Sequence, residues 1–246
     1  MNKGYSLINL KDLRIQVYLD TANINIVKKY CSNKYIKGFT TNPSLMNKMG
    51  IKSYKEFVKK FLLITKNKPV SFEVTSDSLN DIEKQAKRLS SFGGSVYVKI
   101  PVCNTKGLST TKLISKLTSQ KIKINITAIM SFEQIKNIID NVDPEAEIIL
   151  SIFAGRIADT GKDPEDIMIL ANNYIKKKRK NKFLTLWAST RELFNLFQAE
   201  RSSADIITLT PEILQKVKLI NKNLKNYSIE TVKSFYEDGI KNSLDI

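Results

Sequence analysis

The chain has 246 residues and a hydrophobic fraction of 42%, enough for one large domain with a substantial core. Its net charge of +16 ordinarily suggests nucleic acid as a partner. However, the lysines are scattered, and the one dense run, residues 176–180, closes a predicted helix. We therefore expect most of the lysines to lie on a solvated surface. The absence of histidine excludes Ser-His-Asp and Cys-His catalysis, histidine-ligated zinc and histidine general bases.

Short apolar runs alternate with longer helical patterns along nearly the whole chain. Eight strands are predicted, at residues 15–20, 38–42, 70–74, 96–101, 123–129, 147–153, 183–189 and 206–210. The helices predicted between them include residues 53–65, 80–92, 110–120, 131–140, 164–180 and 190–199. Ser131 with Gln134, and Asp163 with Pro164, are typical helix-start signals.

This alternation predicts an α/β fold, a (β/α)8 TIM barrel with an additional C-terminal helix. A doubly wound sheet is the alternative, but no glycine-rich phosphate loop follows the first strand. No linker divides the chain, so residues 1–246 are expected to form a single domain. The additional helix, at about residues 228–244, carries Val232, Phe235 and Tyr236 on one face and could clasp the barrel or a neighbouring subunit.

Lys99 differs from most other lysines because it lies in an apolar run, Val96-Tyr97-Val98-Lys99-Ile100-Pro101, that predicts a buried strand. A buried ammonium is costly unless it is paired, so such a lysine tends to lose its proton and become an amine nucleophile. We therefore expect an enzyme whose amine attacks a ketone and forms a Schiff base.

Polar residues also stand at the ends of the other predicted strands, where a barrel carries its chemistry. They are Asp20, Asn42, Glu73, Asn125, Thr127, Ser151, Arg156, Ser189 and Arg191. Asp20 and Glu73 are the candidate carboxylates for proton transfer, and the two arginines with Ser189 would clamp a phosphate. Taken singly, some have a structural explanation, because Asp20 or Ser189 could cap the helix that follows.

Seven segments in this order resemble the transaldolase family of class I aldolases. They are residues 18–22 (YLDTA), 38–44 (GFTTNPS), 72–74 (FEV), 98–101 (VKIP), 125–127 (NIT), 151–157 (SIFAGRI) and 187–191 (WASTR). The resemblance extends from about residue 15 to 210, and the TTNPS and KIP runs together are its most specific part.

The resemblance implies a role for each of these residues. Lys99 matches the Schiff-base lysine, Asp20 the acid–base group for the C4 hydroxyl, and Glu73 with Thr127 the pair that positions a catalytic water. The implied substrate-binding set is Asn42 and Asn125 for the dihydroxyacetone hydroxyls, Ser151 in the same pocket, Arg156, Ser189 and Arg191 for phosphate, and also Thr41 and Phe153.

The implied reaction moves a dihydroxyacetone unit from a ketose phosphate, such as sedoheptulose 7-phosphate, to an aldose phosphate, such as glyceraldehyde 3-phosphate. It needs no metal or organic cofactor. The expected partners are phosphorylated sugars and further copies of this chain, in a ring-like homo-oligomer that is often a decamer in the compact subgroup. Neither nucleic acid nor a membrane is expected, and Cys31 and Cys103, which form no disulfide framework, favour a reducing cytoplasm.

Three alternatives remain open from the sequence. A fructose-6-phosphate aldolase would release free dihydroxyacetone. That group resembles transaldolases but carries glutamine at the position of Glu73 and tyrosine at the position of Phe153, so this chain follows the transaldolase pattern at both. Trp187, Thr190 and the insert at 158–163 leave room for another sugar phosphate, for example in glycan biosynthesis. A basic binding protein on an inactive barrel would predict a broken catalytic set, whereas every expected residue is present.

Overall fold

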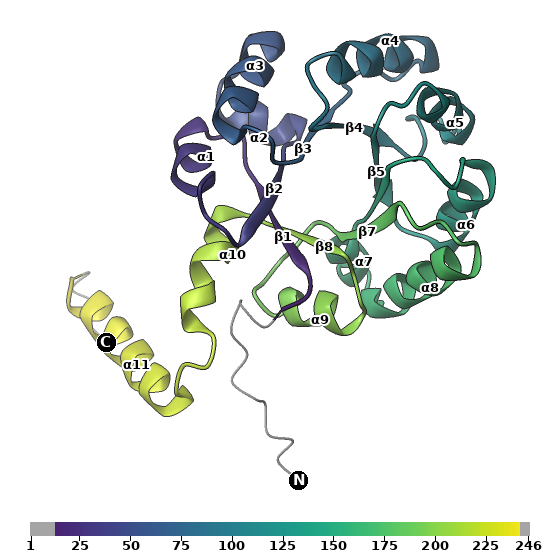
Figure 1. Ribbon diagram of the computed structural model, residues 1–246. Helices are drawn as coiled ribbons and strands as arrows, with labels where there is room; N and C mark the ends of the chain where they lie inside the picture. The colour runs from purple at the N-terminus through teal and green to yellow at the C-terminus, as the bar shows by residue number, and fades with distance from the viewer. Residues whose placement is uncertain (1–12, 242–246) are drawn as a thin grey trace.

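The computed structural model describes residues 13–241, in which eight parallel strands close into a barrel in sequence order (Figure 1). The strands are β1 Gln16–Asp20, β2 Ile36–Thr40, β3 Val70–Glu73, β4 Val96–Pro101, β5 Ile124–Ile129, β6 Ile148–Ile152, β7 Phe183–Trp187 and β8 Ile206–Leu209. The helices are α1 Ile24–Tyr30, α2 Pro43–Lys48, α3 Tyr54–Thr65, α4 Leu79–Ser90, α5 Thr111–Ser119, α6 Phe132–Asn141, α7 Ala154–Ala158, α8 Pro164–Lys177, α9 Asn195–Arg201, α10 Pro211–Gln215, the 3-10 helix η2 Lys216–Leu219, and α11 Leu224–Lys241. The predicted (β/α)8 barrel with a C-terminal helix is confirmed.

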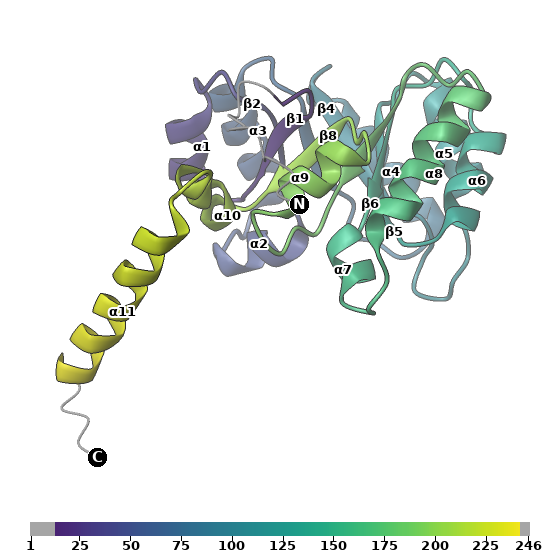
Figure 2. The same cartoon turned by 90° about the horizontal axis from the view of Figure 1, so that it is seen from below.

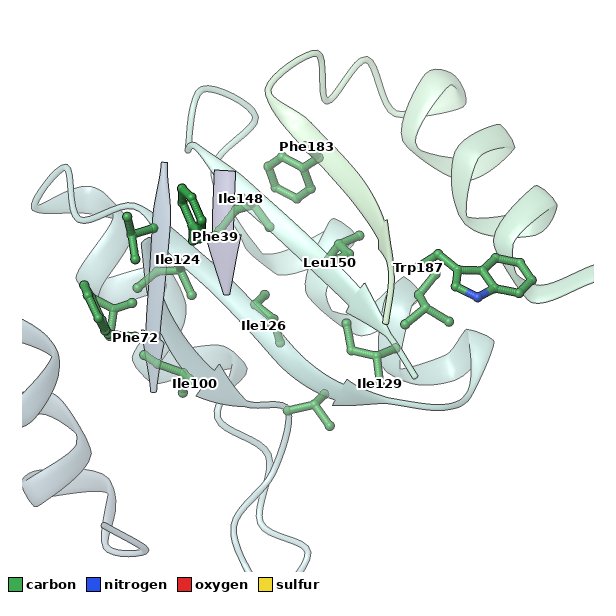
Figure 3. Packing of buried hydrophobic residues seen from close by; sticks show 14 of the residues in the cluster. Phe39, Phe72, Ile100, Ile124, Ile126, Ile129, Ile148, Leu150, Phe183 and Trp187 are labelled. Carbon is green, nitrogen blue, oxygen red and sulfur yellow. The ribbon is translucent and has the colours of Figure 1, made fainter. Parts of the chain in front are cut away.

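The larger apolar core lies between the strands and the surrounding helices. Figure 3 shows part of it, with Phe39, Phe72 and Ile100 on neighbouring strands and Trp187 on β7. Trp187 is fully buried, and its Nε1 is the one buried side-chain polar atom in residues 13–241 without a hydrogen-bond partner. The outer face of the barrel is therefore almost entirely apolar, as burial beneath helices requires.

A second, smaller apolar cluster fills the inside of the barrel. It is formed by Tyr18, Ile149, Leu186, Ala188 and Ile206. Gly38, which pairs in register with Tyr18, leaves room for the phenol ring, because a Cβ at Gly38 would lie 2.6 Å from Tyr18 Cε2. The interior is thus a packed core rather than a pore, and the polar strand ends rest on it.

Several boundaries differ from the sequence prediction, and two of these differences have a local explanation. The second strand was predicted at residues 38–42, but β2 spans Ile36–Thr40, because Asn42 caps α2 and Pro43 occupies its first turn. The start of the helix predicted at residues 190–199 is wrong, since α9 spans Asn195–Arg201. Ser189 has a φ of 63°, and Asn195 Oδ1 accepts the backbone N–H groups of Arg191 and Glu192, so a turn precedes the helix.

The lysine run at residues 176–180 is not wholly solvated. Helix α8 ends at Lys177, and Lys180 is buried, with its Nζ donating to the Val142 carbonyl. Burial lowers the pKa of Lys180, and the nearby Asp143 carboxylate opposes that shift. One member of this run therefore ties α8 to the end of α6.

Helix α11 projects away from the barrel in both views (Figures 1 and 2). It begins at Leu224, earlier than predicted, and the predicted residues 242–244 lie outside the described part of the chain. Val232, Phe235 and Tyr236 are 63%, 70% and 70% exposed, respectively. Among residues 13–241, no helix combines the length and the apolar character that crossing a bilayer requires.

Candidate active site

The carboxyl ends of the strands bring the predicted polar residues together. Parallel pairing sets Glu73 beside Lys99 and Lys99 beside Asn125, while Thr127 lies opposite Pro101. Since alternate residues of a strand share a face, the side chains of Lys99 and Pro101, or of Asn125 and Thr127, point to the same side. The register of β3, β4 and β5 therefore groups an amine, a carboxylate, an amide and a hydroxyl.

Lys99 is buried, with only 7% of its surface exposed. Its Nζ lies 3.0 Å from Glu73 Oε2 and donates to the Thr41 carbonyl at 2.7 Å. The apolar sequence around Lys99 suggested an amine without partners, but in the structure its Nζ has both a carboxylate and a carbonyl partner. Removing the carboxylate of such a buried pair typically costs about 3–5 kcal/mol.

Glu73 is held from two sides. Thr127 Oγ1 donates to Glu73 Oε1 at 2.9 Å, which leaves Oε2 for Lys99. Tyr54, at the start of α3, donates its hydroxyl to the Glu73 carbonyl at 2.8 Å. Burial and the Glu73 charge raise the pKa of Tyr54, so its phenol remains a donor. The sequence analysis missed Tyr54, and no strand-end signal could have found it, because it lies on a helix.

Asp20, at the end of β1, accepts hydrogen bonds from two side chains, one of which is held by a third. Thr40 Oγ1 donates to Asp20 Oδ1 at 2.7 Å, and Asn42 Nδ2 donates to Oδ2 at 3.3 Å. Because Thr40 donates its single hydroxyl proton to Asp20, Thr208 must donate to Thr40 across their 2.7 Å contact. Thr40 and Thr208 were also missed, although both are strand residues that face the interior beside predicted site residues.

The ionisation of Asp20 is set mainly by its burial. Burial raises the pKa of this carboxyl, and the Glu73 charge adds to the rise. The Lys99 charge and the Thr40 hydrogen bond oppose it. Asp20 does not cap α1, because Asn23 supplies that cap, so the structural explanation considered for Asp20 is excluded.

Three buried, neutral polar residues form a hydrogen-bonded row across the strands: Ser71, Asn125 and Ser151. Asn125 Nδ2 donates to Ser71 Oγ at 3.0 Å, and Ser151 Oγ donates to Asn125 Oδ1 at 2.6 Å. These bonds fix which end of the Asn125 amide faces which neighbour. Ser71 is a further residue that the sequence analysis missed.

Two predicted substrate-binding residues already have partners within the protein. Thr41 is fully buried, and its hydroxyl donates to the Ser71 carbonyl. Asn42 Oδ1 accepts the Leu45 N–H as the cap of α2. Thr41 therefore contributes its carbonyl to Lys99, and Asn42 has only its amide N–H groups to offer.

The residues predicted to bind phosphate meet around Gly155. A Cβ at Gly155 would lie 1.7 Å from the Ser189 carbonyl oxygen, so only glycine allows the loop after β7 to lie against α7. Arg156 is exposed and forms no hydrogen bond or ion pair within residues 13–241. Arg191 lies 2.5 Å from Asp159 Oδ2 through its Nη2.

Phe153 completes the predicted set. It follows β6, is half-buried and packs against the interior cluster that contains Tyr18 and Leu186. No group of three or more histidine, cysteine, aspartate or glutamate side chains in the described residues could hold a metal ion. The site is thus built from one lysine, two carboxylates, hydroxyls and amides, with two arginines at its edge.

Comparison with known proteins gives one family and one fold. The model of the family described as Transaldolase/Fructose-6-phosphate aldolase matches residues 17–245. A "Probable transaldolase" of Thermoplasma volcanium is 32% identical over 237 residues, which are 94% of this chain and 98% of that protein. A "Probable transaldolase" of Dehalococcoides mccartyi is 31% identical over 205 residues, 82% of this chain and 90% of that protein.

Among solved structures, 2,3-dimethylmalate lyase, a member of the PEP mutase/isocitrate lyase superfamily, aligns with a TM-score of 0.52 at 10% identity. The alignment covers 96% of this chain and 86% of that chain. At this identity the likeness concerns the barrel fold alone.

The raised pKa of Asp20 generates a prediction about stability. A carboxyl whose pKa is higher in the folded than in the unfolded state costs stability as the pH rises through the folded value. The variant Asp20→Asn should therefore resist urea better than the parent at neutral pH, and this advantage should shrink as the pH falls to the unfolded carboxyl value of about 4. Urea unfolding across this range measures it, and Asp166→Asn on the exposed face of α8 is the control. An advantage independent of pH would contradict the assignment.

Proposed function

The chain belongs to the transaldolase/fructose-6-phosphate aldolase family, and from this premise we propose that it transfers a dihydroxyacetone unit from a ketose phosphate to an aldose phosphate. Sedoheptulose 7-phosphate as donor and glyceraldehyde 3-phosphate as acceptor are the substrates we propose. The observation that carries the proposal is the buried Lys99 Nζ, 3.0 Å from Glu73 Oε2 at the end of β4.

The first step is attack of the Lys99 amine on the ketone carbonyl. The ammonium must lose a proton before it can attack, and Glu73 Oε2 is the base in contact with it. Loss of water from the resulting carbinolamine needs a proton on the departing hydroxyl. The Glu73 carboxyl, oriented by Thr127, can return that proton directly or through a water held between them.

The second step is cleavage of the carbon–carbon bond. The positive charge of the Schiff base withdraws the electron pair of that bond, which yields an enamine on Lys99 and an aldehyde product. The proton of the C4 hydroxyl must leave at the same time, and Asp20 is the carboxylate proposed to accept it. Since burial raises the pKa of Asp20, this group can accept a proton and later return it when the acceptor aldehyde is attacked.

The remaining roles concern binding. We propose that Asn42, Asn125 and Ser151 bind the dihydroxyacetone hydroxyls, since their polar groups lie beside Lys99 and Asp20. We propose that Arg156, Ser189 and Arg191 bind the phosphate. Arg156 has no partner to give up within the described residues, whereas Arg191 must exchange Asp159 for the phosphate.

Transfer, rather than release of dihydroxyacetone, is favoured by two residues. Phe153 has no hydroxyl that could protonate the enamine carbon. The second residue is Glu73, because the fructose-6-phosphate aldolase group carries glutamine at this position. The enamine is therefore expected to persist until an aldehyde arrives.

The Schiff base provides the most direct test. Borohydride reduction in the presence of fructose 6-phosphate should leave a three-carbon adduct on Lys99, found by mass spectrometry of the digested protein. Lys99→Ala should give no adduct, and Lys180→Ala, which removes the other buried lysine amine of residues 13–241, should leave the adduct intact. An adduct on another lysine, or none with several ketose phosphates, would contradict the mechanism.

The choice between transfer and release can be measured separately. Free dihydroxyacetone should form from fructose 6-phosphate at less than about a tenth of the rate of transfer to an aldose phosphate, because the enamine lacks a proton donor. Phe153→Tyr should raise the release rate by supplying one. Comparable release and transfer rates in the parent would favour the lyase.

We also propose that the chain forms a homo-oligomer through α11. Ile229, Val232, Tyr236 and Ile240 recur at helical spacing along this helix and are 47–70% exposed. An apolar stripe of this kind on a projecting helix is typical of an interface. A second copy is the occupant we propose, and the free Cys31 and Cys103 suit assembly in the cytoplasm.

Sedimentation velocity should separate this interface from a solvated helix. Val232→Glu with Tyr236→Glu should shift the protein to smaller assemblies, because each change places a charge in the proposed interface between copies. Ser234→Glu, on another face of α11, should leave the assembly unchanged. A parent protein that sediments as a monomer would refute the proposal.

A further inference from the structure

The positive charge of the chain is concentrated in one part of the barrel. Between Asp20 and Glu73 the sequence contains eleven lysines, no arginine and a single acidic residue, Glu56, so this stretch holds +10 of the net +16. It forms α1, β2, α2 and α3, which lie together on one side of the barrel (Figure 1). The lysines are spread along this stretch, but its net charge is high because acidic residues are nearly absent from it.

A cleft of about 690 Å³ opens within this basic region, between Asp20 and Glu73 in the sequence. It lies between residues 31–37, which join α1 to β2, and residues 64–69, which join α3 to β3. Because both segments precede strands, the cleft is at the amino-terminal ends of β2 and β3. The candidate active site is at the opposite end of the same strands, and the volume is in the range of small-molecule sites, about 300–1,000 Å³.

Lys68 joins the two walls of the cleft. Its Nζ donates to the carbonyls of Asn33 at 2.9 Å and Ile36 at 2.6 Å, and it has no carboxylate partner within residues 13–241. Burial and the neighbouring Lys37 lower the pKa of Lys68, while Cys31 opposes the shift. The half-buried Lys68 ammonium therefore has two carbonyl partners but no negatively charged partner among the described residues.

Three more lysines surround this ammonium. Lys34, Lys37 and Lys66 line the cleft, are exposed, and form no ion pair in the described part of the chain. Lys66 caps α3 with φ 56° and ψ −116°, a conformation that glycine adopts far more readily than lysine. This conformation ends α3, since the Lys66 backbone N–H donates to the Leu62 carbonyl, and it leaves the lysine side chain exposed at the edge of the cleft.

We propose that this cleft binds a small molecule that carries two or more phosphate groups. Four ammonium groups around one concavity suit several phosphates, which lysine binds as a point charge. Ile64 and Pro69, which are half-buried, offer apolar contacts to the carbon skeleton. No aromatic side chain lines the cleft, so the stacking platform on which single-stranded nucleic acids depend is missing there.

The test compares two triple variants with the same change in charge. Binding of inorganic pyrophosphate and of ATP is measured by calorimetry at physiological ionic strength. Lys34→Gln, Lys37→Gln and Lys66→Gln together should weaken binding about tenfold or more, as expected for three exposed charge contacts. Lys55→Gln, Lys59→Gln and Lys60→Gln on the exposed side of α3 should change it less than about twofold, because these lysines lie outside the cleft.

Cys31, which lines the cleft, supplies an independent readout. Pyrophosphate or ATP should slow alkylation of Cys31 and leave that of Cys103, on the loop after β4, unchanged. Equal weakening by both triple variants, no binding by the parent, or binding of an RNA oligonucleotide but of neither phosphate probe would overturn the proposal. None of these outcomes depends on whether Lys99 forms a Schiff base, since the two sites lie at opposite ends of the barrel.

Discussion

The pairing of Lys99 with Glu73 is the constraint on which the site depends. A buried ammonium is tolerated only if a carboxylate and further acceptors reach it, and in this chain those groups come from different strands. Glu73 reaches Lys99 because β3 and β4 pair in that register, and the Thr41 carbonyl reaches it from the turn after β2. The pairing of neighbouring strands therefore also supplies the groups that compensate the charge of Lys99.

The polar groups around this pair form a nearly saturated network. Thr127 and Thr40 each donate to a carboxylate, and Thr208 and Tyr54 hold the groups next to them. A substrate must therefore exchange existing hydrogen bonds rather than fill an empty polar cavity. Exchange of equivalent bonds costs little, whereas an analogue lacking the matching hydroxyl would leave a buried group unpaired.

The sequence predicted the strand-end residues well, because a run of apolar residues that ends in one polar group has a simple meaning in a parallel barrel. Lys99, Asp20 and Glu73 were found in this way. Thr40, Ser71 and Tyr54 were missed because threonine and serine are common within strands and Tyr54 acts from a helix. The predicted helix start at residue 190 was wrong, because nothing in the local sequence pattern reveals that Ser189 has a positive φ.

Trp187 gives the molecule a property unrelated to catalysis. It is the single tryptophan of the chain, fully buried on β7, with an indole N–H that lacks a hydrogen-bond partner in the described residues. Ser189 lies two residues further along, in the loop that packs against Gly155 and leads to Arg191. The chain thus contains a single intrinsic fluorophore, buried in an apolar environment and two residues from the loop proposed to hold a phosphate.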